Sequence, residues 1–182
     1  GSGFLVRYAI ADVPAFVAPG GAIDGEARQR GQTMYAPDGR TPLHPERLSE
    51  DAASLLPNQD RPAFVWTFKL DDAGSVIDTD LVRAMVRSRA QLDYDTVQRD
   101  LDAGTADPML VLLGEVGTRR ISQEQARGGA SLAIPDQEVV TSADGQGYEL
   151  RMRPPHAVED HNAQLSLMTG MAAAEIMLAG GV

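Results

Sequence analysis

The sequence has no cysteine, few aromatic residues and no long apolar run. Without cysteine the chain forms neither a disulfide nor a thiolate metal site, and a reducing compartment such as the cytoplasm is the default expectation. No stretch of the roughly 20 apolar residues that cross a bilayer is present, so we expect no membrane partner. Hydrophobic residues still make up 43% of the 182 residues, which is enough for one domain with a core.

Basic residues are also scarce, with 16 Lys and Arg against 26 Asp and Glu and a net charge of -10. This balance argues against a free-standing nucleic-acid binder, because phosphate contacts normally need an excess of cationic side chains. It does not exclude a metal-dependent nuclease, whose chemistry needs carboxylates. Composition therefore leaves a soluble enzyme or an interaction module open.

The patterns that are present predict an α+β fold with a mixed or antiparallel sheet. The strongest pattern is the alternation over residues 63–70, followed by a turn at Asp71–Gly74 and a return strand over 75–90, which together predict an antiparallel hairpin. We expect further strands over residues 4–10, 131–141 and 148–153, and helices over 24–30, 107–127 and 156–179, with one more between the cap Asp93 and Gly104.

Two helices have apolar patterns from which we predict burial. In the helix over 107–127, we expect Met109, Leu112, Leu113 and Val116 to face inward. In the last helix, two different stripes are largely apolar, so we expect its C-terminal part to be buried all round.

The side chains that carry chemistry form no complete active site. His156, Glu159 and His161 resemble a zinc motif, but two histidines five residues apart point roughly 140° away from each other on a helix, so we expect no metal site there. Asp71 and Asp72 are adjacent, as in some two-metal sites, but their place before Gly74 favours a turn. The sequence has no phosphate-binding loop, dinucleotide motif or nucleophile elbow.

Aromatic and arginine side chains on the hairpin have two interpretations each. Phe64, Trp66 and Phe68 could stack on bases, but we favour a buried face of the sheet. On the return strand Arg83, Arg87 and Arg89 share a parity, which fits either phosphate contacts or a solvated strand face. The residues alone leave that choice open.

Ordered motifs from Phe4 to about Met177 resemble the catalytic domain of the RNB (ribonuclease II) family of exoribonucleases. Residues 8–13, Tyr-Ala-Ile-Ala-Asp-Val, resemble the family's strand that ends in Ile-Ala-Asp. Residues 20–31 resemble its Gly-x-x-Leu-Asp helix that ends in Arg-Gly, and residues 33–49 resemble its Tyr-Leu-Pro and Leu-Pro-x-x-Leu-Ser loop. The similarity continues through residues 87–95 and is weakest in the helix after Asp107.

The resemblance implies an RNB-like partial domain over residues 1–182 of an enzyme that degrades single-stranded RNA from its 3′ end to nucleotide monophosphates. It implies magnesium as the cofactor, held by an Asp-rich motif that precedes the strand starting at Phe4, and an active-site arginine that follows Val182. We therefore expect no catalytic residue and no metal ligand in this segment, and no RNA hydrolysis by it alone. The expected partners are single-stranded RNA and the missing parts of the same catalytic domain.

The resemblance also implies which residues of this segment position RNA. Tyr35 falls where the family stacks a tyrosine on the terminal nucleotide, and Tyr94 falls on a second channel tyrosine. Arg83, Arg87 and Arg89 complete the predicted RNA-binding set. Leu132 lies near a position where some members carry a clamp phenylalanine, and Gln164 aligns with a typical glutamate. The alternative function is a catalytically inactive RNB-like module that binds RNA or a protein partner.

Overall fold

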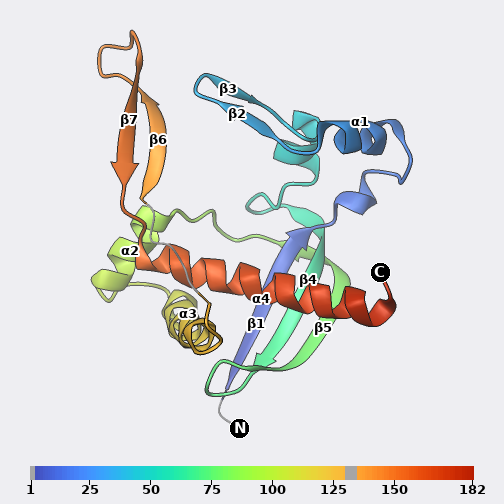
Figure 1. Cartoon of the computed structure of the whole chain (residues 1–182), viewed down its shortest axis with the longest axis vertical. Coiled ribbons are helices and arrows are strands. Elements are labelled where there is room, and N and C mark those ends of the chain that lie inside the picture. The colour runs from blue at the N-terminus through green and yellow to red at the C-terminus, as the bar shows by residue number, and fades with distance from the viewer. Residues whose placement is uncertain (1–2, 130–134) are drawn as a thin grey trace.

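The computed structural model describes residues 3–129 and 135–182, and these form a mixed α and β structure (Figure 1). The strands are β1 (Phe4–Ala11), β2 (Met34–Ala36), β3 (Gly39–Thr41), β4 (Asp60–Leu70), β5 (Val76–Arg87), β6 (Asp136–Thr141) and β7 (Tyr148–Arg153). The helices are α1 (Ala22–Arg30), α2 (Tyr94–Asp102), α3 (Pro108–Ala126) and α4 (Ala157–Gly180), with short turns η1 (Val13–Ala15) and η2 (Arg47–Ala52). The predicted α+β class is confirmed.

The central sheet has the strand order β1-β4-β5, and both pairings are antiparallel. Its β4–β5 hairpin is the one that the alternating pattern predicted. The connecting turn depends on Asp71, whose carboxylate accepts hydrogen bonds from the backbone N–H groups of Ala73 at 2.9 Å and Ser75 at 2.8 Å. Asp71 therefore serves the turn, as its place before Gly74 suggested.

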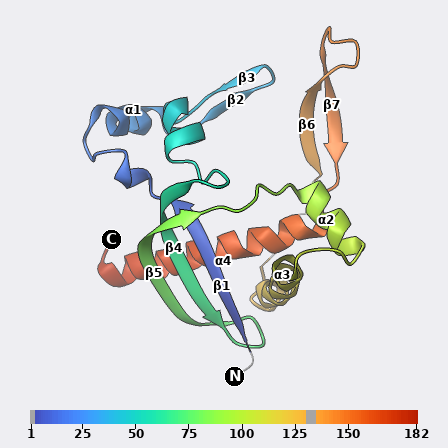
Figure 2. The same ribbon diagram turned by 180° about the vertical axis from the view of Figure 1, so that it is seen from behind.

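The main core lies between one face of this sheet and helices α3 and α4. Trp66, Phe68 and Leu70 pack against Val116 of α3 and against Met168 and Ala172 of α4. The Trp66 and Phe68 rings are stacked, with centroids 5.9 Å apart. These aromatic side chains are core residues, as we favoured, and Phe64 is half-buried farther along the same face. Figure 2 shows that no described helix covers the opposite face of the sheet.

Helix α3 corrects part of the sequence prediction. Val116 is buried and Leu113 packs on a core cluster, but Met109 and Leu112 are exposed. The first half of α3 buries Leu110 against α2 and the start of α4, whereas the second half buries Val116 against the sheet. The buried stripe therefore drifts around the helix, and a single inward face was the wrong expectation.

Helix α4 is not buried all round, which is a second correction. It lies across the central sheet (Figure 1), and Met168 and Ala172 face the sheet core. Leu167, Met171 and Leu178 remain exposed on the described surface. The apolar outer stripe that suggested complete burial is uncovered among the described residues.

The remaining strands form two hairpins, which both lie on the side of the molecule away from the N-terminus (Figure 1). β2 pairs with β3 and β6 pairs with β7, both antiparallel. The second hairpin confirms the one predicted after the long helix, although its first strand begins at Asp136 and the earlier part of the predicted range, 131–134, lies outside the described residues. No helix in the described part of the chain is long and apolar enough to cross a membrane.

Candidate functional site

Tyr35 is largely exposed to solvent. It lies in β2, directly opposite Arg40 of β3, and 78% of its surface is accessible. Arg40 forms an ion pair with Glu50 of η2, which ties the hairpin to the loop that follows it. A ring presented in this way can stack on a nucleobase without first leaving a core.

Arg83 is held by a buried carboxylate. Its Nη2 donates to Asp12 Oδ1 at 2.9 Å, and the two side chains are 58% and 5% exposed. The guanidinium also lies over the Phe64 ring, 5.0 Å from its centroid. The same Asp12 oxygen accepts the backbone N–H of Ala15, which caps η1. Arg83 is therefore fixed in direction while its outer surface stays open to an anion.

Arg87 lies four residues farther along the same face of β5. Its Nε and Nη2 donate to the two carboxylate oxygens of Asp60, both at 2.7 Å. These hydrogen bonds hold the pKa of Asp60 below its ordinary value and raise the pKa of Arg87. An incoming phosphate would have to compete with this carboxylate, or accept a hydrogen bond from the remaining guanidinium N–H groups.

Arg89 departs from the predicted arrangement. β5 ends at Arg87, so Arg89 lies beyond the strand and its position does not follow from strand parity. Its side chain is exposed. The chain is nonetheless anchored just before it, because the backbone N–H of Asn58 donates to the carbonyl of Ser88 at 2.7 Å. The predicted set of three arginines on one strand face is thus a set of two.

Tyr94 begins α2, where Asp93 caps the helix by accepting the Thr96 backbone N–H at 2.8 Å. That hydrogen bond lowers the pKa of Asp93. The Tyr94 hydroxyl accepts a hydrogen bond of 3.0 Å from Nδ2 of Asn162 in α4. Its ring lines a hollow of about 230 Å³ together with residues of α3 and α4. Tyr94 is therefore fixed at a surface depression, although it is 68 residues away from its partner in the sequence.

Polar contacts at the start of α4 hold this region together. His156 Nε2 lies 2.6 Å from Oδ1 of Asp95, and the backbone N–H of Val158 donates to Gln98 at 3.1 Å. Glu159 accepts hydrogen bonds from Arg153 of β7, the shorter of 2.6 Å, and Arg153 lowers the pKa of Glu159 to about 2. The beginnings of α2 and α4 and the end of β7 are thereby linked.

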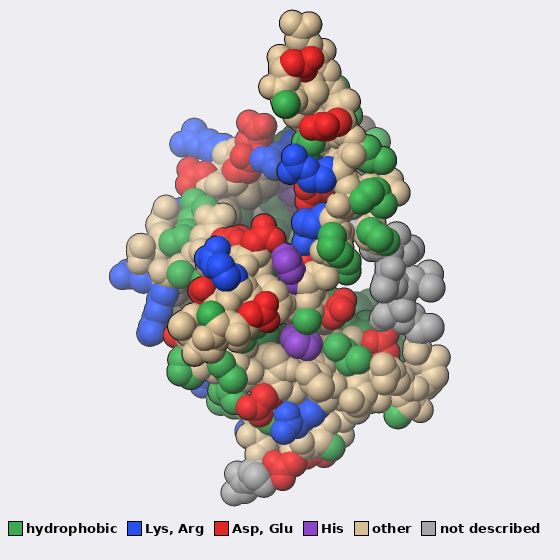
Figure 3. All heavy atoms as spheres, turned by 90° about the vertical axis from the view of Figure 1, so that its left-hand side faces the viewer, with side chains coloured by type: hydrophobic (Ala, Val, Ile, Leu, Met, Phe, Trp, Pro, Cys, Tyr) green, Lys and Arg blue, Asp and Glu red, His purple; other side chains and the backbone are tan. Residues whose placement is uncertain are grey.

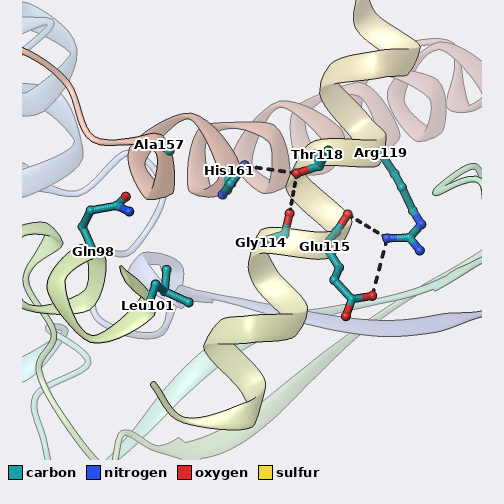
Figure 4. Close-up of a pocket in the computed structure, with 8 residues that line it drawn as sticks. All are labelled: Gln98, Leu101, Gly114, Glu115, Thr118, Arg119, Ala157 and His161. Atoms are coloured by element: carbon teal, nitrogen blue, oxygen red, sulfur yellow. Dashed lines mark hydrogen bonds and ion pairs between the residues drawn. The ribbon is translucent and has the colours of Figure 1, made fainter. Parts of the chain in front are cut away.

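A larger hollow of about 410 Å³ opens between α2, α3 and α4 (Figure 4). Thr118 donates its hydroxyl hydrogen to the Gly114 carbonyl at 2.8 Å and lies 3.4 Å from His161 Nε2. Arg119 and Glu115 lie at its edge and form an i,i+4 ion pair of 3.5 Å. None of the predicted RNA-binding residues lines this hollow.

Gln164 does not face an open surface. It is buried between α3 and α4, where its Nε2 donates to Oε2 of Glu124 at 2.5 Å. Asn162, two residues earlier in α4, is the side chain that meets Tyr94. Sequence reasoning missed Asn162 because no spacing pattern links it to Tyr94. Leu132, near the predicted clamp position, lies outside the described residues.

The described residues offer no magnesium site. No three Asp, Glu or His side chains within residues 3–129 and 135–182 come together so as to hold a metal ion. His156 and His161 have different partners, Asp95 and Thr118 respectively. This absence of a metal site is stated for residues 3–129 and 135–182 only.

The predicted residues form separate contact points. Arg83 and Arg87 share one face of β5, Tyr35 lies on the β2–β3 hairpin and Tyr94 lies at α2. No hydrogen bond, ion pair or ring contact between described residues joins any two of them. Figure 3 shows acidic and basic side chains interleaved on the face that it presents, with no large patch of one sign. On that face, an RNA contact would depend on individual side chains and not on a broad basic surface.

Comparison with known proteins identifies the family. The model of the RNB domain matches residues 1–180, so the chain belongs to the RNB-domain family. Exoribonuclease 2 of Actinobacillus pleuropneumoniae serotype 3 is 40% identical over 102 residues, which are 56% of this chain and 16% of that protein. Ribonuclease R of Aquifex aeolicus is 30% identical over 166 residues, which are 84% of this chain and 23% of that protein.

The fold agrees with that assignment. The structure of Mycoplasma genitalium RNase R in complex with double-stranded RNA superposes with a TM-score of 0.89 at 23% identity, over 98% of this chain and 33% of that one. A relative named Inactive exonuclease DIS3L2, from Arabidopsis thaliana, is 40% identical over 102 residues, 56% of this chain and 10% of that protein. The chain thus spans a third or less of the length of these relatives, and one of them is named as inactive.

Proposed function

We propose that this chain is the RNA-positioning part of a 3′-to-5′ exoribonuclease that hydrolyses single-stranded RNA to nucleotide monophosphates. The observation that carries the proposal is the RNB-domain match over residues 1–180. The geometry supports it, because Tyr35 is exposed for stacking and Arg83 is held in a fixed direction by Asp12. Stacking accepts any base, which suits an enzyme that degrades RNA regardless of sequence.

The proposal assigns binding and orientation to this segment, and no bond-breaking step. In the whole enzyme, magnesium is the proposed cofactor; held by carboxylates, the ion would supply activation of water and stabilisation of the leaving oxygen. The described residues do not fit such an ion, since they form no suitable cluster. We therefore derive no step through the metal and assign its ligands to no residue named here.

Binding of labelled 12-nucleotide oligoadenylate to the purified chain, followed by fluorescence anisotropy at 50 mM salt, tests the proposal. We expect saturable binding that weakens with salt, and tighter binding to the single strand than to a blunt duplex of equal length. Binding to neither RNA would contradict the proposal.

The alternative is a catalytically inactive RNB-like module. The reason to consider it is that one relative, from Arabidopsis thaliana, is named as inactive. Anisotropy does not separate the two functions, because an inactive module can also bind RNA. Release of nucleotide monophosphates by the longest protein that contains this segment, with magnesium present, separates them. Saturable binding without product release would favour the inactive module.

A further inference from the structure

Asp60 and Arg87 form an ion pair that is open to water. Arg87 Nε and Nη2 donate to the two carboxylate oxygens of Asp60, both at 2.7 Å, in a bidentate arrangement. The Arg87 and Asp60 side chains are 59% and 56% exposed. Exposed ion pairs add little to stability, because water solvates the separated partners almost as well. The pair can therefore open at little cost to the fold.

A phosphodiester group can take the place of the Asp60 carboxylate. A guanidinium binds carboxylate and phosphate through the same two parallel N–H···O hydrogen bonds. Nε and Nη2 of Arg87 are the two donors that Asp60 now occupies. Because one anion replaces another on these donors, the charge of Arg87 stays compensated when the partners exchange.

The carboxylate of Asp60 is anchored by Arg87 alone. In the described part of the chain, no other group donates a hydrogen bond to it, and the hydrogen bond from Arg87 is the main cause that lowers the pKa of Asp60. Asp12 differs, because it is 5% exposed and accepts the Ala15 backbone N–H as well as the hydrogen bond from Arg83. Asp12 is thus a permanent partner of Arg83, whereas Asp60 is free to turn away from Arg87.

The backbone around the exposed pair is fixed. Asp60 and Arg87 are directly opposite each other in the β4–β5 ladder. One residue after Arg87, the carbonyl of Ser88 accepts the backbone N–H of Asn58 at 2.7 Å. An exchange of partners on Arg87 therefore moves side chains and leaves the sheet in place.

We infer that Asp60 is an internal competitor for RNA, whose carboxylate occupies the phosphate position on Arg87 and retakes it when a phosphate leaves. The inference rests on the proposed function, and it gives Asp60 a role in the release of RNA through Arg87. An enzyme that moves along a strand must release each phosphate that it binds. Asp60 speeds that release, because its carboxylate replaces the departing phosphate and no bare cation is left behind.

Stopped-flow dissociation of the labelled 12-nucleotide oligoadenylate tests the inference. Asp60→Asn keeps the size of the side chain and removes its charge, so RNA should leave this variant about three- to fivefold more slowly, the scale of an exposed ion pair. Asp78→Asn is the matched control, because Asp78 forms a similar exposed β4–β5 ion pair of 2.7 Å with Lys69. It removes the same charge and should leave the dissociation rate within about 1.5-fold of wild type.

Association rates separate this local effect from a general effect of charge. Loss of one negative charge from a chain of net charge -10 should speed association with RNA, and it should do so alike in Asp60→Asn and Asp78→Asn. Slower dissociation should belong to Asp60→Asn alone. In an Arg87→Ala background Asp60→Asn should no longer slow dissociation, because the cation for which the carboxylate competes is absent.

Two results would overturn the inference. One is dissociation from Asp60→Asn at the rate of wild type or of Asp78→Asn. The other is a slowing by Asp60→Asn that persists in the Arg87→Ala background. Asp60→Ala removes the carboxylate in a second way and should also slow dissociation, so the same comparison holds if Asp60→Asn does not fold.

The outcome is separable from that of the proposed function. If the wild-type chain binds the 12-nucleotide RNA but Asp60→Asn and Asp78→Asn release it equally fast, the competitor role is wrong and the RNA-positioning role stands. If the chain binds no RNA, both are wrong.

Discussion

Arg120 of α3, which is buried, donates a hydrogen bond of 3.1 Å to the backbone carbonyl of Gly74 in the β4–β5 turn. Two neighbours on α3 add to this contact. Arg119 Nε donates to the Asp72 carbonyl and Gln123 Nε2 to the Ala73 carbonyl, both at 2.9 Å. Helix α3 therefore holds the turn of the central hairpin by its backbone, which fixes the helix against the sheet that carries Arg83 and Arg87.

Gly74→Ala should destabilise the fold. Gly74 has φ of +82°, and a Cβ there would lie 2.9 Å from Cβ of Arg119. Gly145 is the matched control, since its φ is +70° but a Cβ would meet nothing within 4 Å. We expect a loss of about 1 kcal/mol in the free energy of unfolding for Gly145→Ala, from strain alone, and about 2–3 kcal/mol for Gly74→Ala. Equal losses in urea denaturation would show that the contact between α3 and the turn is unimportant.

Glu159 should make stability depend on acid pH. Its hydrogen bonds with Arg153 lower its folded-state pKa from 4.5 to about 2. A depressed carboxyl pKa stabilises the fold fully above pH 4.5 and loses that contribution as pH falls toward 2. Glu159→Gln should therefore cost about 1–2 kcal/mol at pH 7 and nearly nothing at pH 2. A difference between wild type and variant that is constant from pH 7 to 2.5, by chemical denaturation, would contradict this assignment.

The exposed end of α4 should make the isolated chain self-associate. Leu178 is 76% exposed, and Ile176 and Met177 beside it are also exposed. Apolar patches of this kind mark contact surfaces or association hazards. We expect sedimentation velocity to show concentration-dependent association that Leu178→Glu reduces and Ser122→Glu, at an exposed polar position of α3, does not. Association that both substitutions reduce alike would point to a general charge effect.

Arg87 should contribute one phosphate contact to RNA binding. Arg87→Ala should reduce the salt dependence of binding, the slope of log K against log salt, by about 0.7 for a single strand. Lys69→Ala is the matched control, because Lys69 forms a similar β4–β5 ion pair with Asp78, of 2.7 Å, on the other face of the sheet. An equal change in slope for the two variants would mean that Arg87 has no specific role.

Local patterns in the sequence predicted the elements well. The alternation through Trp66 and Phe68 predicted both β4 and its buried face, and Asp93 and Gly104 marked the two ends of α2. These features depend on neighbours within a few residues, so the sequence pattern contains them. Which α3 side chains are buried depends on the elements that the helix contacts along its length. The prediction that Met109 and Leu112 face inward was therefore wrong.

The geometry of the candidate site could not be predicted from the sequence, because it also depends on contacts between distant segments. Asp12 and Arg83 are 71 residues apart, and Asn162 and Tyr94 are 68 apart. Each pair exists because antiparallel pairing or helix packing brings distant segments together. The family resemblance supplied Tyr35 and Tyr94 as residues, but only the fold shows that one ring is free and that the other is held by Asn162.

The affinity of Tyr35 variants for single-stranded RNA tests the central claim most directly. Tyr35→Ala should weaken binding of the 12-nucleotide oligoadenylate by about 5- to 150-fold, which corresponds to the roughly 1–3 kcal/mol of one base stacked on an aromatic ring. Tyr35→Phe should bind within about twofold of wild type, because the ring and not the hydroxyl stacks. Tyr148→Ala, which removes an exposed tyrosine from the β6–β7 hairpin, should leave the affinity unchanged. Wild-type affinity for a correctly folded Tyr35→Ala chain would contradict the account.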